Sequence, residues 1–231
     1  LGLRQIPTVL IEENSTLSVD PRANATQART MEHYRRHGFA DEVRSLGLPP
    51  DFPTDVAYFT RFAKHELARF KLPSAEEARN KVRKLLSGPW SAAELPHRIS
   101  QNLIVDVLYK HAKKYKSNSI RFSHKLIDFS DNGDHVTVDI LNKKTGKQHT
   151  IKGRYLIGAD GPTSHIREAL GIHYEGSNEK TRQFMGGPML AVLLKVPRFY
   201  ELCKHSKAWM YVTFNADRRA YMVAVNGRDE F

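Results

Sequence analysis

The feature that most constrains the fold lies at residues 155–167, where an apolar run leads into a glycine-bordered turn and then a helix. The turn is Gly158-Ala159-Asp160-Gly161, and Ser164 stands where the N-cap of the helix is expected. Two glycines permit positive φ angles or a close backbone approach, and the N-terminus of a helix suits a phosphate. An ordinary strand–turn–helix corner accounts for the same residues. Either way, the pattern predicts a mixed α/β chain.

A second strand is predicted near the start of the chain. Thr8-Val9-Leu10-Ile11 is a short apolar run that predicts a buried strand, and Glu12 follows at its end. In dinucleotide-binding folds a carboxylate at this point binds ribose hydroxyls, about 20 residues after a glycine loop. A solvated strand end is the alternative. That loop would precede Leu1, which is not Met and begins what looks like the end of a helix, so we expect an interior piece of a longer protein.

The other elements follow from hydrophobic periodicity and turn residues. Helices are predicted over 28–37, 40–46, 74–86, 101–115 and 164–170, with Ser74 and Ser100 as additional N-caps. Strands are predicted over 56–62, 66–70, 119–130, 135–141, 149–157, 189–196, 208–214 and 220–225. The turns at 131–134 and 143–146 predict that the middle strands form a β-meander.

Composition narrows the function classes. Lys and Arg total 36 against 25 Asp and Glu, a formal charge of +11, which favours an anionic partner. The single cysteine, Cys203, excludes an internal disulfide framework and a multi-cysteine metal site, and it fits a cytoplasmic protein. No apolar run approaches the length of a membrane span, and no histidine spacing predicts a metal site. Ser164 lies in no hydrolase nucleophile motif.

Basic residues raise one alternative from another class, a nucleic-acid-binding module. Tyr115 stands among Lys110, Lys113, Lys114, Lys116 and Arg121. A lysine-rich helix end is commonly a solvated face that complements the helix dipole, and no recognised nucleic-acid motif accompanies it. We therefore expect no nucleic acid as partner.

Several segments taken together, and in order along the chain, point to one family. They are Val9–Glu12, Pro21-Arg22-Ala23, Gln27–Glu32, Arg36-His37-Gly38, Leu46–Pro49, Pro96–Gln101, and Ala159–Ser164 with Arg167 and Leu170-Gly171-Ile172. The chain resembles the single-component, class A flavin-dependent aromatic hydroxylases related to para-hydroxybenzoate hydroxylase and phenol hydroxylase. The closest resemblance is to the chlorophenol and phenol hydroxylase branch.

The resemblance implies an α/β architecture: an FAD-binding nucleotide-binding fold interleaved with an antiparallel-sheet substrate region. Residues 1–48 would belong to the FAD-binding domain and 49–96 to a substrate-side insertion. Residues 97–172 would continue the FAD-binding domain with the β-meander. Residues 173–231 would start the substrate-domain sheet.

The resemblance also implies five cofactor-binding residues. Glu12 would bind the ribose of the FAD adenosine, and Arg22 would lie near the pyrophosphate, where a guanidinium suits phosphate. Gln101 would contact the flavin-side phosphate or the ribityl chain. Asp160 and Gly161 belong to the motif that the family uses around FAD and the nicotinamide cofactor. No catalytic side chain and no metal ligand are assigned.

The implied reaction is the hydroxylation of a small phenolic or related aromatic substrate with FAD, NADPH or NADH, and O₂. No side chain need act as a nucleophile, and a homodimer is left open. The 231 residues contain neither the family's N-terminal glycine-rich loop nor its later Gly-Asp stretch. A non-catalytic fragment or pseudoenzyme scaffold is therefore the first alternative, and a basic nucleic-acid-binding module is the second.

Overall fold

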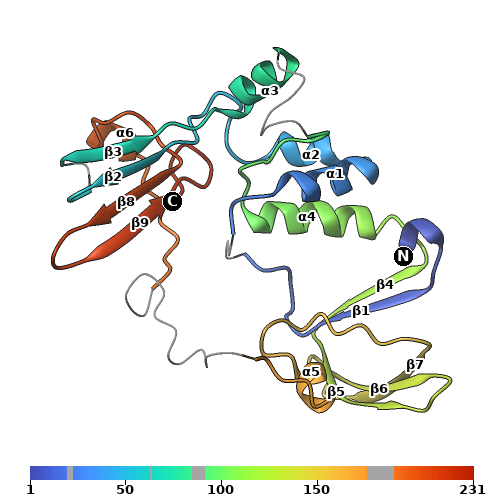
Figure 1. Cartoon of the computed structure of the whole chain (residues 1–231). Helices are drawn as coiled ribbons and strands as arrows, with labels where there is room; N and C mark the ends of the chain where they lie inside the picture. Colours follow the sequence, from blue (N-terminus) through green and yellow to red (C-terminus); the bar gives the residue numbers. More distant parts are fainter. Residues whose placement is uncertain (20–22, 63, 85–91, 176–189) are drawn as a thin grey trace. The chain divides into compact units, whose positions relative to one another are not determined.

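The structure of the chain is a computed structural model that describes residues 1–19, 23–62, 64–84, 92–175 and 190–231. Contacts divide it into two compact units (Figure 1). Unit 1 comprises Leu1–Thr16 and Ala112–Met189, and unit 2 comprises Leu17–His111 and Leu190–Phe231. Each unit therefore combines segments that are distant in the sequence. The domain boundaries expected at residues 48, 96 and 172 stay a prediction.

Unit 1 begins with a 3-10 turn, Gly2–Arg4, and a parallel strand pair. β1 (Thr8–Glu12) pairs with β4 (Asn118–Phe122), from Thr8 opposite Asn118 to Glu12 opposite Phe122. The prediction of one strand over 119–130 is wrong, because the chain breaks at Ser123, which has a φ of +57°. The Ser123 N–H donates to the Asn14 carbonyl at 2.8 Å, a bond to the segment that follows β1.

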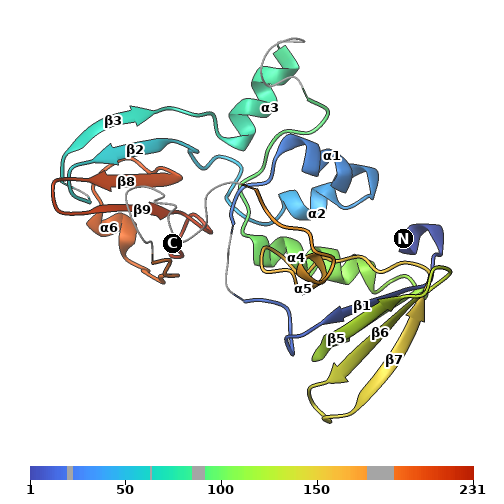
Figure 2. The same cartoon turned by 60° about the horizontal axis from the view of Figure 1, so that its bottom comes forward.

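After the break, three antiparallel strands form the predicted β-meander (Figure 2). They are β5 (His124–Asp131), β6 (Val136–Asn142) and β7 (Gln148–Gly153), in that order. The turn predicted at 131–134 is confirmed, with the Asn132 N–H donating to the His135 carbonyl at 2.9 Å. Gly133 adopts a φ of +88°, a conformation that favours glycine.

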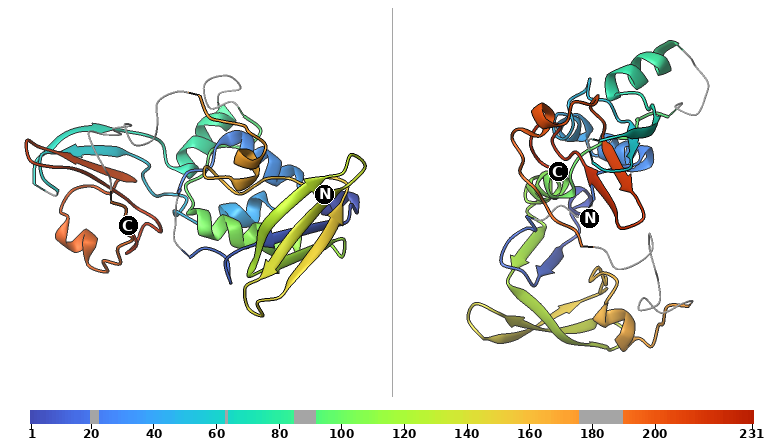
Figure 3. Two further views of the ribbon diagram at one scale, coloured as in Figure 1. Left: turned by 90° about the horizontal axis from the view of Figure 1, so that it is seen from below. Right: turned by 90° about the vertical axis from the view of Figure 1, so that its left-hand side faces the viewer.

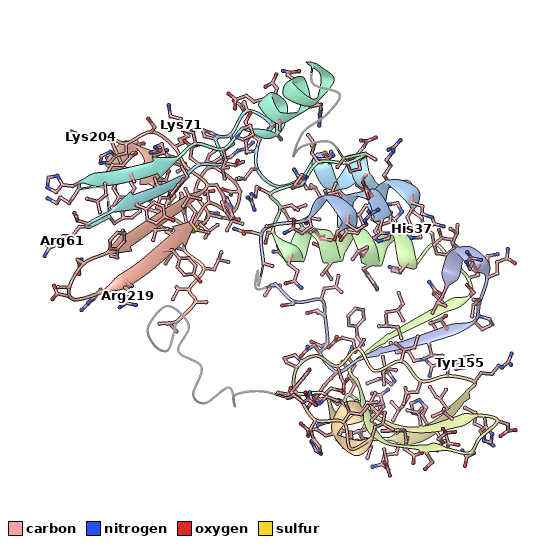
Figure 4. All side chains as sticks on the ribbon, viewed as in Figure 1. His37, Arg61, Lys71, Tyr155, Lys204 and Arg219 are labelled. Carbon is pink, nitrogen blue, oxygen red and sulfur yellow. The ribbon has the colours of Figure 1, made fainter. Side chains whose placement is uncertain are left out.

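Two strand predictions in unit 1 need correction. β7 ends at Gly153 rather than at Ile157. Tyr155, which is labelled in Figure 4, is 82% exposed, and Ile157 is 72% exposed. β1 forms as predicted but is not buried, since Val9 and Leu10 are 42% and 51% exposed. The reason is the same in both places. A strand needs hydrogen-bonded neighbours to form and to be covered. Among the described residues, β1 pairs only with β4, and residues 155–157 pair with no strand.

The helical part of unit 2 packs around one core. It contains α1 (Ala28–Arg36), α2 (Ala40–Arg44) and α4 (Gln101–Ala112), and α4 ends three residues earlier than predicted. The buried side chains are Met31, Phe39, Ala40, Val43, Ile99 and Val107. Gly38 and Gly47 follow α1 and α2 with φ angles of +82° and +89°, which confirms Gly38 as a helix-ending glycine.

α3 (Ala75–Lys84) begins with the predicted cap. The Glu77 N–H donates to Ser74 Oγ at 3.1 Å, and the Ser74 N–H donates to Glu77 Oε2 at 3.0 Å. This reciprocal pair satisfies two backbone donors at the start of the helix.

The sheet of unit 2 has the strand order β3-β2-β8-β9, as the labels in Figure 2 show, and its teal and red strands are seen from two further sides in Figure 3. β2 (Val56–Phe59) pairs with β3 (Glu66–Phe70) antiparallel and with β8 (Met210–Phe214) in parallel, and β9 (Arg219–Val223) completes it antiparallel to β8. Strands that are far apart in the sequence thus form one sheet. The core of this part of unit 2 includes the aromatic residues Phe59, Phe199, Trp209 and Tyr211.

Two further expectations fail in this unit. The described part of the strand expected at 189–196 forms only an isolated bridge between Lys195 and Glu230, and Met189 lies outside the described residues. A short helix, α6 (Phe199–Leu202), was not predicted. An apolar run does not reveal whether a partner strand is available. Here Leu190 and Val192 are 89% and 58% exposed, and Val196 packs against the core of the sheet.

Candidate cofactor-binding site

Glu12 is the last residue of β1, opposite Phe122 of β4. Its Oε1 accepts hydrogen bonds from the backbone N–H and the side-chain amide of Asn14, both at 2.8 Å. No described residue donates to Oε2. A carboxylate has lone pairs to spare, so one oxygen fixes the orientation and the other remains able to accept hydroxyl groups. This is the arrangement that binding of a ribose requires.

Asp160 lies in the turn before α5 (His165–Ala169). Its carboxylate accepts from Ser164 Oγ at 2.5 Å and from the Ile166 N–H at 3.2 Å, and the bond from Ser164 chiefly lowers the pKa of Asp160. Ser164 in turn accepts from the Arg167 N–H at 3.0 Å, which confirms it as the N-cap. The described partners of Asp160 thus belong to its own turn, and its contact with a cofactor stays a prediction.

Gly161 and Arg167 shape the same loop. Gly161 has a φ of +80°, and a Cβ there would meet no atom within 4 Å, so glycine suits this position through its backbone conformation. The Arg167 guanidinium donates to the carbonyls of Pro162 at 2.6 Å and Ile172 at 3.3 Å, and it lies 4.3 Å from the ring centre of Tyr174. The loop is therefore held in place by its own side chains.

Gln101 is the first residue of α4 and belongs to unit 2. Its N–H donates to the Ala23 carbonyl at 2.8 Å, while its side-chain amide is exposed and meets no described partner. The prediction that Ser100 caps this helix is wrong, because Ser100 Oγ is buried without a hydrogen-bond partner. The Leu103 N–H donates to Asn102 Oδ1 at 2.9 Å, so at the start of this 12-residue helix the Asn102 N–H is left without a described partner and could donate to a phosphate.

The five predicted residues are distributed as follows. Glu12, Asp160 and Gly161 lie in unit 1, Gln101 lies in unit 2, and Arg22 lies outside the described residues. Within the residues present, the open oxygen of Glu12 and the start of α4 fit a ribose and a phosphate. Sequence reasoning missed Asn14, the residue that orients Glu12. Its signal was an asparagine two positions after the acid, a spacing at which side chains bond locally.

In the described portion of the chain, no cluster of three or more histidine, cysteine, aspartate or glutamate residues could hold a metal ion. No helix within that portion has the length and apolar character needed to cross a membrane. The one cysteine, Cys203, is buried.

Similar proteins support the same interpretation. Aklavinone 12-hydroxylase DnrF of Streptomyces peucetius is 34% identical over 190 residues, covering 80% of this chain and 37% of that protein. Phenol 2-monooxygenase of a Pseudomonas species is 29% identical over 171 residues, covering 74% of this chain and 27% of that protein. The chain therefore spans about a third of the length of the relatives it matches.

A solved structure shows the same fold. The flavin-dependent monooxygenase PieE, determined in complex with FAD and substrate, superimposes with a TM-score of 0.81 at 21% identity, covering 99% of this chain and 38% of PieE. This confirms the predicted α/β architecture. The family described as "FAD binding domain" matches residues 1–230, nearly the whole chain. The chain therefore belongs to this family of FAD-binding domains, as its resemblance to the flavin-dependent aromatic hydroxylases predicted.

Proposed function

We propose that this chain is part of an FAD-dependent monooxygenase that hydroxylates a phenolic or related aromatic substrate with NADH or NADPH and O₂. The observation that carries the proposal is the match to hydroxylases along the chain, including 34% identity to aklavinone 12-hydroxylase over 190 residues. A relative named phenol 2-monooxygenase supports the same class of substrate. Membership in the family of FAD-binding domains supports FAD as the cofactor.

The residues of the chain would hold the cofactor rather than perform the chemistry. Glu12 would accept hydrogen bonds from the adenosine ribose through its open oxygen, and Gln101 would bind a phosphate or the ribityl chain at the start of α4. Arg22 would lie at the pyrophosphate. The loop with Asp160 and Gly161, held by Ser164, would present its backbone to FAD or the nicotinamide cofactor.

Bound FAD supplies the redox and oxygen chemistry in this class of enzyme. The protein would then contribute binding, orientation and the exclusion of water from an apolar substrate site. We expect the protein in the cytoplasm, in keeping with a single cysteine that is buried. A homodimer is compatible with the proposal and is not required by it.

The test uses the protein purified in its natural form. We expect a flavin absorbance band, oxidation of NADH or NADPH that phenols stimulate, and a hydroxylated product in amounts matching the NAD(P)H consumed. A colourless protein that gains no flavin band on addition of FAD would overturn the proposal and favour a non-catalytic scaffold. NAD(P)H oxidation that no phenol stimulates would favour a flavin reductase instead.

A further inference from the structure

A pocket of about 240 Å³ lies within unit 2, beside the start of α3 and the segment 92–98 that precedes α4. Much of its wall is apolar, contributed by Leu48, Pro49, Phe52, Leu72, Ala78 and Leu95. Of the residues proposed to hold FAD, the described ones do not line it. The pocket is large enough for a small organic molecule and too apolar to attract an inorganic ion through its walls alone.

One wall residue, Arg98, carries a charge that the described residues leave unpaired. Its guanidinium stacks on Trp209, 3.7 Å from the ring centre, and makes no hydrogen bond or ion pair with any described residue. Burial lowers the pKa of this guanidinium, which nevertheless stays charged at any physiological pH. A partly buried cation whose N–H donors lack partners is costly, so the arrangement favours an anion from outside the chain.

The other charged groups of the wall do not neutralise Arg98. Among the described residues that line the pocket, Glu94 is the one carboxylate, and it pairs with Arg44 at 2.7 Å. Arg79 is exposed and has no described ion-pair partner. His97 is buried, and burial lowers its pKa, so it adds no positive charge at neutral pH. The described lining residues therefore include three arginines and one glutamate, and their net charge is positive.

We propose that this pocket binds a small organic carboxylate with an apolar body, and that Arg98 is its anchor. The planar guanidinium of arginine matches the geometry of a carboxylate with two parallel hydrogen bonds. The apolar wall would cover the body of the ligand, which inorganic phosphate lacks. Stacking on Trp209 holds the fork of Arg98 in one orientation, so little conformational freedom is lost on binding. The inference does not depend on the proposed function.

Benzoate and its neutral analogue benzamide test the proposal, by calorimetry on the unmodified protein and by fluorescence on a Trp90→Phe variant. Trp209 lies beneath Arg98, so its fluorescence in a Trp90→Phe background reports on the pocket, and calorimetry provides an independent affinity. We expect benzoate to bind at least tenfold more tightly than benzamide, with or without FAD present. Equal affinities for the two compounds would overturn the proposal. Affinity for inorganic phosphate equal to that for benzoate would also overturn it, because the apolar wall would then contribute nothing.

Variants of Arg98 test whether benzoate binds in this pocket. Arg98→Gln should weaken benzoate binding at least tenfold and leave benzamide binding unchanged. Arg61→Gln is the matched control, because Arg61 is an exposed arginine beyond β2 and outside the pocket (Figure 4). If Arg98→Gln does not fold, Arg98→Lys keeps the charge without the planar fork and should still weaken benzoate binding. Unchanged benzoate affinity in a folded Arg98 variant would overturn the proposal, as would displacement of benzoate by FAD.

Discussion

Replacing Gly47 by alanine probes the backbone segment that carries Arg98 and leads into α4. Gly47 follows α2 with a φ of +89°, in the left-handed region. An added Cβ would run into the carbonyl oxygen of Arg98 and lie 2.9 Å from the Cα of Ile99. That carbonyl accepts a hydrogen bond from the Leu48 N–H at 3.0 Å, so it cannot move away freely. The substitution must therefore displace the backbone on one side or the other.

The magnitude has two parts, and a second glycine separates them. Gly38 has a similar φ of +82°, but a Cβ there would meet no atom within 4 Å. Gly38→Ala should lower the free energy of unfolding by about 1–2 kcal/mol, because alanine is strained in the left-handed conformation. Gly47→Ala adds overpacking of about 1–3 kcal/mol, for a sum of about 2–5 kcal/mol. The difference between the two variants measures the close approach of Gly47 to Arg98.

Urea unfolding followed by tryptophan fluorescence measures both variants, because Trp209 is buried in unit 2. We expect a lower midpoint for Gly47→Ala than for Gly38→Ala, with unchanged slopes. Equal midpoints would refute the reasoning, because they would show that Gly47 serves only as a left-handed residue and that no backbone lies against it.

Three further predictions concern Glu42 and Tyr211 in unit 2. Hydrogen bonds from Lys110 at 2.6 Å and His111 at 2.7 Å lower the pKa of Glu42 from 4.5 to about 2. The contribution of Glu42 to stability is therefore complete above pH 4.5 and is lost as the pH falls towards 2. An NMR titration should show this midpoint, and Glu42→Gln should abolish that part of the acid dependence of unfolding. A midpoint near 4.5 would contradict the contacts. Tyr211→Phe should cost about 1–3 kcal/mol, because the Ala208 N–H donates to the Tyr211 hydroxyl at 2.9 Å and would lose its acceptor. Ultraviolet titration should place the pKa of Tyr211, raised by burial, at about 12, and ionisation near pH 10 would argue against its burial.

Local signals were predicted well from the sequence. The caps at Ser74 and Ser164, the turn at 131–134 and the glycine after α1 each depend on residues within a few positions of one another. Hydrogen bonds of this range are encoded by residue type and spacing alone. The family resemblance added the architecture, which the match over residues 1–230 confirms.

Long-range contacts decided the rest. Ser123 breaks a continuous β-pattern because its N–H bonds to Asn14, more than a hundred positions earlier, and no glycine marks the place. Residues 155–157 read as a strand yet pair with no described strand, since periodicity does not supply a neighbour. Ser100 stands at a cap position, yet its hydroxyl makes no hydrogen bond. The environment of Arg98 could not be predicted, because it depends on Trp209, far along the chain.

The affinity of the protein for FAD, compared with FMN, tests the central claim most directly. FMN lacks the adenosine, so a residue that binds the adenosine ribose contributes to the affinity for FAD alone. We predict that Glu12→Ala weakens FAD binding about tenfold or more, as expected for hydrogen bonds to a charged group, and leaves FMN binding unchanged. Glu13→Ala is the matched control and should change neither affinity, because Glu13 forms exposed ion pairs with Lys143 and Lys125. Undiminished FAD affinity in Glu12→Ala, or equal losses for FAD and FMN, would contradict the account.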